Sequence, residues 1–139
     1  NLPVVVSVAN VGQSNSDVTF QYTLQISSIS PSRGSYGGGQ SVTINGDGLN
    51  SSSVSVTVCG QSCQSVNALS DTQLVCVTPS ATFLSADTTC SLTVTIGSLT
   101  ATASYVYGAN VTATVSSISP VRGGTGGGTT LTITGSNFP

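Results

Sequence analysis

Four cysteines have the side chains and spacing most suited to chemistry in this sequence of 139 residues. They are Cys59, Cys63, Cys76 and Cys90, separated by three, twelve and thirteen intervening residues. An even number of cysteines permits a disulfide framework, and the residues alone leave three pairings open. A four-cysteine zinc site is the alternative, but such sites typically use twin Cys-x₂-Cys pairs, which these spacings lack. We therefore predict two disulfides, and with them an oxidising, extracellular compartment.

Other reactive side chains are scarce. The net charge is −2, and Lys, Glu, His, Met and Trp are absent. The charged residues are Arg33, Arg122, Asp17, Asp47, Asp71 and Asp87. A chain with so little positive charge cannot neutralise phosphates, which argues against nucleic-acid binding. Without His and Glu, it lacks the components of most acid–base pairs, Ser-His-Asp triads and His-type metal sites. We therefore expect neither an enzyme nor a bound metal or cofactor.

Hydroxyl groups are abundant where charges are missing, since the chain has 25 Ser and 20 Thr. A weakly charged surface promotes association, so we predict that covalent glycans hydrate it. The alternative is a polar surface without sugars. Two Asn-x-Ser/Thr sequons begin at Asn50 and Asn110, a number that composition alone accounts for. Their positions, in a strand-linking loop and between two repeat units, predict exposed N-glycan acceptors, and outward-facing Ser and Thr are candidate O-glycan sites.

An internal repeat divides the chain. Residues 26–50 and 115–139 align without a gap at an offset of 89, with 13 of 25 positions identical. An aromatic-x-aromatic triplet precedes each copy, at 20–22 and at 105–107, and we expect these four aromatic side chains to face a core. A period of this length suits an array of small domains. We predict the end of one unit in residues 1–24, a complete unit in 25–109 and the start of a third in 110–139.

The complete unit has the pattern of an all-β domain. Short runs rich in β-branched residues, most of them alternating apolar and polar, occupy 41–44, 54–58, 74–77, 92–96 and 99–107. Turn-forming residues separate them, and no helical period is present. This spacing predicts an antiparallel β-sandwich. No apolar run reaches the roughly 18 residues of a membrane span, so we expect no membrane insertion in this segment.

The order of motifs in 26–107 resembles the IPT/TIG domain family. The motifs are Ser-x-Ser-Pro, Arg-Gly, a triple glycine and Thr-Ile-x-Gly, followed by Cys-Gly-x-x-Cys, Leu-Val-Cys-x-Thr-Pro and the closing aromatic strand. The resemblance implies an immunoglobulin-like sandwich, repeated in tandem. Members occur in plexin-like and fibrocystin-like surface proteins, in some starch-active enzymes and in Rel-type transcription factors. The resemblance also implies a Cys63–Cys76 disulfide, which leaves Cys59 to pair with Cys90.

Three further motifs have both a functional and a structural interpretation. The triple glycines at 37–39 and 126–128 suggest a phosphate loop, but no helix or Lys follows, and a wide turn is the simpler interpretation. Residues 45–48 suggest a calcium loop, but Asp47 is their only carboxylate, and a tight turn explains them. Arg33 and Arg122 share one repeat position. They either contact a neighbouring unit, stack on a sugar or on Tyr36, or cap carbonyl groups in a loop.

We therefore predict a structural repeat module of a large extracellular or cell-surface glycoprotein. The short linker, residues 108–114, should hold neighbouring repeats close together in a semi-rigid rod, and such rods could assemble into filaments. The alternative is an adhesion or receptor ectodomain that binds a protein ligand. It predicts an exposed cluster of Tyr36, Phe83 and Phe138. A carbohydrate-binding module is a third hypothesis, weakened by the absence of Trp.

Overall fold

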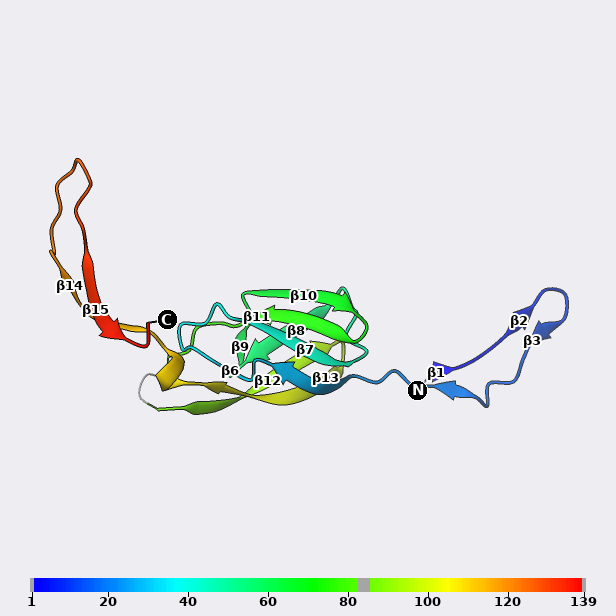
Figure 1. Ribbon diagram of the computed structural model, residues 1–139. Coiled ribbons are helices and arrows are strands. Elements are labelled where there is room, and N and C mark those ends of the chain that lie inside the picture. Colours follow the sequence, from blue (N-terminus) through cyan, green and yellow to red (C-terminus); the bar gives the residue numbers. More distant parts are fainter. Residues whose placement is uncertain (1, 83–85, 139) are drawn as a thin grey trace.

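The chain folds into a two-sheet β-sandwich with a β-hairpin arm at each end (Figure 1). The computed structural model describes residues 2–82 and 86–138. Across the first sheet the strands are β10 (Ser65–Ser70), β11 (Gln73–Val77), β7 (Ser41–Asp47) and β5 (Gln25–Ser30). Across the second they are β6 (Arg33–Gly34), β13 (Leu99–Tyr107), β12 (Thr88–Ile96), β8 (Val54–Val58) and β9 (Gln61–Ser62).

This arrangement confirms the predicted all-β sandwich. Every strand pair in the two sheets is antiparallel except β6 with β13, where Arg33 lies opposite Val106. The five predicted runs all fall within strands, but β5, β6, β9 and β10 were not predicted. Strands β6 and β9 have only two residues each. Strands β5 and β10 are rich in Ser and lie at the edge of their sheet, so neither shows the strong alternation of a strand buried on one face.

Alternate side chains of the two sheets form one core. In β7, Val42, Ile44 and Gly46 are buried, while the residues between them are partly exposed. Strand β12 buries Cys90, Leu92 and Val94 in the same way, because successive side chains of a strand point to opposite faces. The core also contains residues from the other strands and two loops: Tyr36, Leu49, Val56, Val58, Leu74, Cys76, Tyr105 and Tyr107.

The arm after the sandwich repeats the first hairpin of the complete unit. Strands β14 (Thr114–Ser119) and β15 (Thr132–Ser136) pair with Ile118 opposite Ile133, as β5 and β7 pair with Ile29 opposite Ile44. A register shift occurs at the equivalent position of both hairpins. The Ser-Pro peptides at 30–31 and 119–120 are both cis. The repeat seen in the sequence is therefore also a repeat of backbone structure.

The shared glycine of the Thr-Ile-x-Gly motif has a steric cause. A Cβ atom on Gly46 would collide with the backbone carbonyl of Gln25, and one on Gly135 would collide with that of Thr114. Only glycine permits the two strands to approach so closely at this point.

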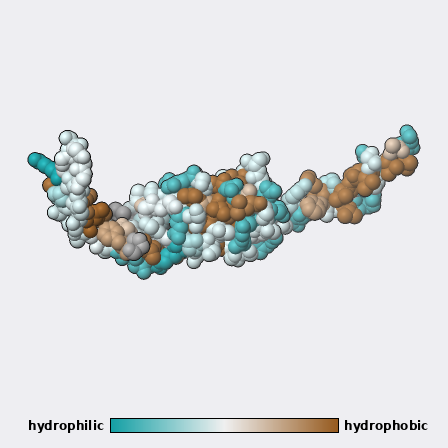
Figure 2. Space-filling view, turned by 45° about the horizontal axis from the view of Figure 1, so that its top comes forward, coloured by the Kyte–Doolittle hydropathy of each residue, from teal (hydrophilic) through white to brown (hydrophobic). Residues whose placement is uncertain are grey.

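The arm before the sandwich consists of two short antiparallel pairs. Strand β1 (Leu2–Pro3) pairs with β4 (Thr19–Phe20), and β2 (Ser7–Val8) pairs with β3 (Gly12–Gln13). Figure 2 shows apolar residues gathered along this arm. The expectation that all four paired aromatics face a core is wrong for this arm, since Phe20 is 55% and Tyr22 64% exposed. No second sheet covers the arm in the described structure, and the two rings meet edge to face with their centroids 5.1 Å apart.

Candidate functional site

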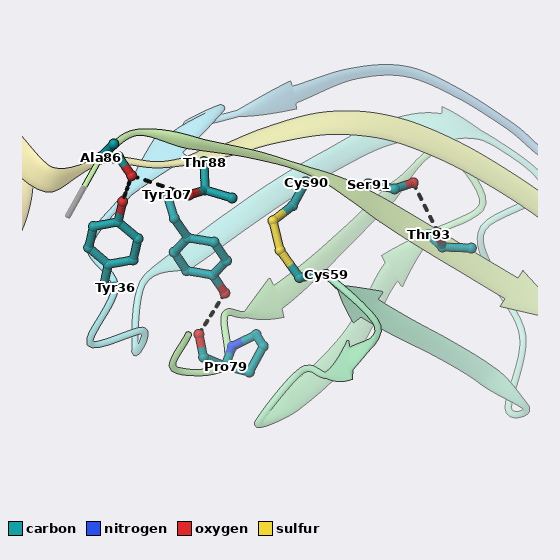
Figure 3. Close-up of a disulfide and its surroundings, with 9 residues drawn as sticks. All are labelled: Tyr36, Cys59, Pro79, Ala86, Thr88, Cys90, Ser91, Thr93 and Tyr107. Atoms are coloured by element: carbon teal, nitrogen blue, oxygen red, sulfur yellow. Dashed lines mark hydrogen bonds between the residues drawn. A yellow bond between two sulfur atoms is a disulfide. The ribbon is translucent and has the colours of Figure 1, made fainter. Parts of the chain in front are cut away.

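The four cysteines form two disulfides that reinforce the sandwich at different places. Cys59 follows β8 directly and bonds to Cys90, with the Cα atoms 5.0 Å apart (Figure 3). Cys90 lies inside β12 rather than before a strand, so this bond links two neighbouring strands of one sheet. Cys63 follows β9 and bonds to Cys76 in β11, with the Cα atoms 5.9 Å apart. This second bond joins the two sheets.

Three tyrosines close one end of the core. The rings of Tyr36 and Tyr107 stack at 6.1 Å between centroids, and Tyr105 meets Tyr107 edge to face at 5.2 Å. The Tyr107 hydroxyl donates to the Pro79 carbonyl at 2.7 Å, and that of Tyr36 donates to the Ala86 carbonyl (Figure 3). Burial, together with the neighbouring Tyr105, raises the pKa of Tyr107 to about 12. These side chains are structural, because they are enclosed and hydrogen-bonded.

This enclosure weakens the hypothesis of an aromatic binding patch. Tyr36 is only 3% exposed, so it cannot belong to a surface cluster. Phe83 lies outside the described residues. Phe138 is exposed, but on the arm that follows the sandwich.

Arg33 is the centre of a polar contact at the same end of the sandwich. One of its terminal nitrogens, Nη2, donates to Oδ2 of Asp87 and to Oδ1 of Asn110, both at 2.6 Å. The other oxygen of Asp87 accepts the backbone N–H of Ala109 at 3.1 Å. The hydrogen bond from Arg33, then that from Ala109, lowers the pKa of the Asp87 carboxyl below its ordinary value. Within residues 2–82 and 86–138, the Arg33 side chain thus binds side-chain oxygens, with no carbonyl contact and no stacking on Tyr36.

These contacts converge on residues 108–112, which we call the joint. The joint contains a single 3₁₀ turn, Ala109–Val111, and connects the sandwich to β14. Gly108 lies beneath the Arg33 guanidinium, since a Cβ there would come 2.6 Å from Arg33 Nε. Thr112 completes the attachment: its hydroxyl accepts the Tyr36 N–H at 3.0 Å and donates to the Gly108 carbonyl at 2.7 Å.

The joint is also held from the side of the following arm. The Asn137 amide Nδ2 donates to the carbonyls of Ala109 at 3.2 Å and Thr112 at 2.9 Å. Asn137 has a positive φ of 58°, in the left-handed region that Asn tolerates better than most side chains. Its repeat equivalent, Gly48, also has a positive φ, and a Cβ there would collide with the Thr23 carbonyl. Asn137 therefore holds the joint through a side chain, which its equivalent in the complete unit, Gly48, does not have.

The triple-glycine motif at 37–39 lies in a turn, as its structural interpretation expected. In the triple-glycine turn, the N–H of Gly38 binds the Ser35 carbonyl and that of Gly39 binds the Thr78 carbonyl, so these donors are used within the fold.

Across residues 2–82 and 86–138, no three His, Cys, Asp or Glu side chains are placed to hold a metal ion. Asn50 and Asn110 are both exposed. No helix in that part of the chain is long and apolar enough to cross a membrane.

Comparison with known proteins identifies the family. The IPT/TIG domain profile matches residues 24–111 and 113–139, and the chain belongs to this family. Human fibrocystin-L is 38% identical over 142 residues, and mouse fibrocystin-L is 38% identical over 140. Each alignment covers 98% of this chain but only 3% of the relative, so the chain spans a very small part of these proteins.

Solved structures share the fold. The full extracellular region of plexin A4 matches with a TM-score of 0.54 and 27% identity, over 68% of this chain and 8% of that region. The TIG domain of human nuclear factor of activated T-cells, cytoplasmic 4, matches with a TM-score of 0.51 and 20% identity. That match covers 60% of this chain and 86% of the domain, and it shows the fold alone. A tandem arrangement of IPT domains fits relatives that are so much longer than this chain.

Proposed function

We propose that this chain is a structural segment of a large extracellular or cell-surface glycoprotein, in which successive IPT units form a semi-rigid rod or filament. The observation that carries this proposal is the joint. A flexible linker would leave residues 108–112 free of contacts, whereas here the sandwich binds them through Arg33, Asp87 and Tyr36. The following arm binds them through Asn137. Such a joint transmits the orientation of one unit to the next.

The two arms support the proposed units at 1–24, 25–109 and 110–139. They leave the sandwich at opposite ends (Figure 1), as a linear array requires. Their apolar side chains are exposed, including Val6 and Phe20 in one arm and Ile118 and Ile133 in the other. The equivalents of Ile133 and Phe20 in the complete unit, Ile44 and Tyr105, are fully buried. The rest of a sandwich would cover each arm in the same way, with neighbouring IPT repeats as the partners of this unit.

Two disulfides and a nearly uncharged surface support an extracellular location and attached glycans. Disulfides persist in oxidising compartments. A chain in which only 4% of the residues are charged needs another source of surface hydration, and both sequon asparagines are exposed. N-glycans at Asn50 and Asn110 would supply it. The family and the hydrogen-bonded state of the tyrosines favour a non-catalytic role.

Electron microscopy of the native protein tests this function. Compact units of about 89 residues should appear as beads at an axial spacing of roughly 30–45 Å, with narrowly distributed angles between neighbours. A chain of beads with freely varying angles would contradict the rod. Intact-mass analysis of the same material should show added sugar, and a mass equal to that of the bare polypeptide would contradict the glycoprotein.

A pair of matched variants tests the joint itself. Arg33→Gln should reduce the hydrogen-exchange protection of the Ala109 and Thr112 amides, because it removes the cation that orders Asp87 and Asn110. Arg122→Gln is the control, since Arg122 has the same repeat position but no ion pair in the described structure. Equal protection in both variants would show that Arg33 does not stabilise the joint.

A further inference from the structure

The two sequons differ in whether their amide and hydroxyl groups are hydrogen-bonded in the folded chain. Asn50 lies in the connection between β7 and β8, and both Asn50 and Ser52 are exposed. In the part of the chain that the structure describes, neither side chain forms a hydrogen bond to another protein group. The acceptor amide and the hydroxyl of this sequon are therefore both accessible in the folded protein.

The second sequon is built into the joint. Asn110 belongs to the 3₁₀ turn, and its Oδ1 accepts a hydrogen bond from Arg33. The Thr112 hydroxyl is used twice, as an acceptor for the Tyr36 N–H and as a donor to the Gly108 carbonyl. The Thr112 carbonyl is bound by Asn137. Of the groups that define this sequon, only Nδ2 of Asn110 lacks a partner among these contacts.

N-glycosylation requires more than an exposed nitrogen. In this reaction Nδ2 forms a bond to the anomeric carbon of a lipid-diphosphate-linked oligosaccharide. The bond from that carbon to the phosphate oxygen breaks, the lipid diphosphate leaves with the electron pair, and one Nδ2 proton passes to a base. The transferase must also bind the sequon hydroxyl, which distinguishes Ser and Thr from other residues. A hydroxyl already hydrogen-bonded within a folded turn cannot be bound until that turn opens.

We propose that Asn110 accepts its glycan only before the joint folds, whereas Asn50 accepts one before or after folding. This inference rests on the glycoprotein part of the proposed function. After folding, Arg33 holds Oδ1 of Asn110, and Nδ2 has no partner among the described residues, so a sugar already attached there is compatible with the closed joint. The attached amide keeps its carbonyl oxygen and therefore its hydrogen bond from Arg33. Folding of the joint thus ends the period in which Asn110 can be modified, whereas Asn50 can still be modified afterwards. Both glycans are compatible with the folded protein.

The order of modification is tested with this chain made without glycans and with both disulfides formed. A purified oligosaccharyltransferase and a lipid-diphosphate oligosaccharide donor are added to the folded chain, and separately to the reduced, alkylated and unfolded chain. Mass spectrometry of the two sequon peptides gives the rate at each site. In the unfolded chain both sites should react. In the folded chain the ratio of the Asn110 rate to the Asn50 rate should fall at least about tenfold, because local opening must precede reaction.

Three variants locate the cause. Asn137→Ala and Arg33→Gln each remove contacts to the joint without changing either sequon, so each should accelerate modification of Asn110 in the folded chain and leave Asn50 unchanged. Arg122→Gln should change neither rate. The proposal is overturned if folding leaves the ratio of rates unchanged, if Asn110 fails to react even in the unfolded chain, or if neither joint variant accelerates it.

The proposed function has a separate readout. Sugar on Asn50 in protein from its natural source supports the glycoprotein, whatever the order of modification. A native protein whose intact mass equals that of the bare polypeptide would contradict the glycoprotein while leaving the in vitro rate ratio intact as a property of the joint.

Discussion

Arg33 and Asp87, 54 positions apart in the chain, form an ion pair with 2.6 Å between Nη2 and Oδ2. The pair uses one of only two cations and one of only four carboxylates in the sequence. Both side chains are partly exposed, at 37% and 50%, so the pair contributes little to the stability of the fold. Its effect is positional, because both partners also bind the joint.

The first prediction concerns pH. Arg33 and the Ala109 N–H lower the pKa of Asp87 in the folded protein below its ordinary value of 3.8. The stabilisation from this carboxylate is therefore present above pH 3.8 and lost as the pH falls through the lowered pKa. The hydrogen-exchange protection factor of the Ala109 amide should decrease in that window. Asp87→Asn should show low protection without this pH dependence, and a matching pH dependence in the variant would assign the effect to another group.

The second prediction concerns the disulfides. A bond that closes a longer loop restricts the unfolded chain more. The Cys63–Cys76 bond spans 13 positions and the Cys59–Cys90 bond spans 31. Replacing both cysteines with Ser should lower the free energy of unfolding by about 3 kcal/mol for the first pair and about 3.7 kcal/mol for the second. Denaturant titration of the two double variants measures both values, and a larger loss for the shorter loop would contradict this entropic account.

The third prediction concerns Tyr107. Tyr107→Phe removes the hydroxyl that donates to the Pro79 carbonyl and leaves that acceptor without this partner. We expect a loss of about 1–3 kcal/mol in the free energy of unfolding. Tyr105→Phe is the matched control, since its hydroxyl makes a longer contact of 3.3 Å to Gln40 Oε1. Denaturant titration should rank Tyr107→Phe as the more damaging variant, and the reverse order would be inconsistent with these contacts.

The fourth prediction concerns the repeated glycine. Gly46→Ala would place a methyl group against the Gln25 carbonyl and force β5 away from β7. Overpacking of this kind costs about 1–3 kcal/mol. Gly124→Ala is the control, because nothing lies within 4 Å of a Cβ there and its φ is not in the left-handed region. Thermal unfolding of the two variants should separate them, and equal melting temperatures would show that the strands adjust without cost.

Five strands of the sandwich and the repeat were predictable from the sequence, because alternating residues identify strands and recurring motifs identify a repeat. Apolar residues at every second position identify strands such as β12 wherever one face is buried and the other exposed. The same pattern did not identify β5 and β10, because these Ser-rich edge strands show little alternation between apolar and polar residues. The offset of 89 predicted that residues 110–139 begin another unit, and β14 pairs with β15 as β5 pairs with β7, because identical motifs at identical spacing favour the same strand pairing.

The joint could not be predicted in this way, because its partners are far apart in the chain. Arg33 lies 54 positions from Asp87 and 77 from Asn110, and no periodicity relates them. Equivalent residues also have different environments: Tyr105 is buried by a second sheet, whereas Phe20 lies on an arm without one. The amino-acid sequence by itself determined the strands, the repeat and the supply of hydroxyls, sequons and cysteines. Only the tertiary structure decided which hydroxyl is free and which is bound, because that depends on packing between segments that the chain brings together from a distance.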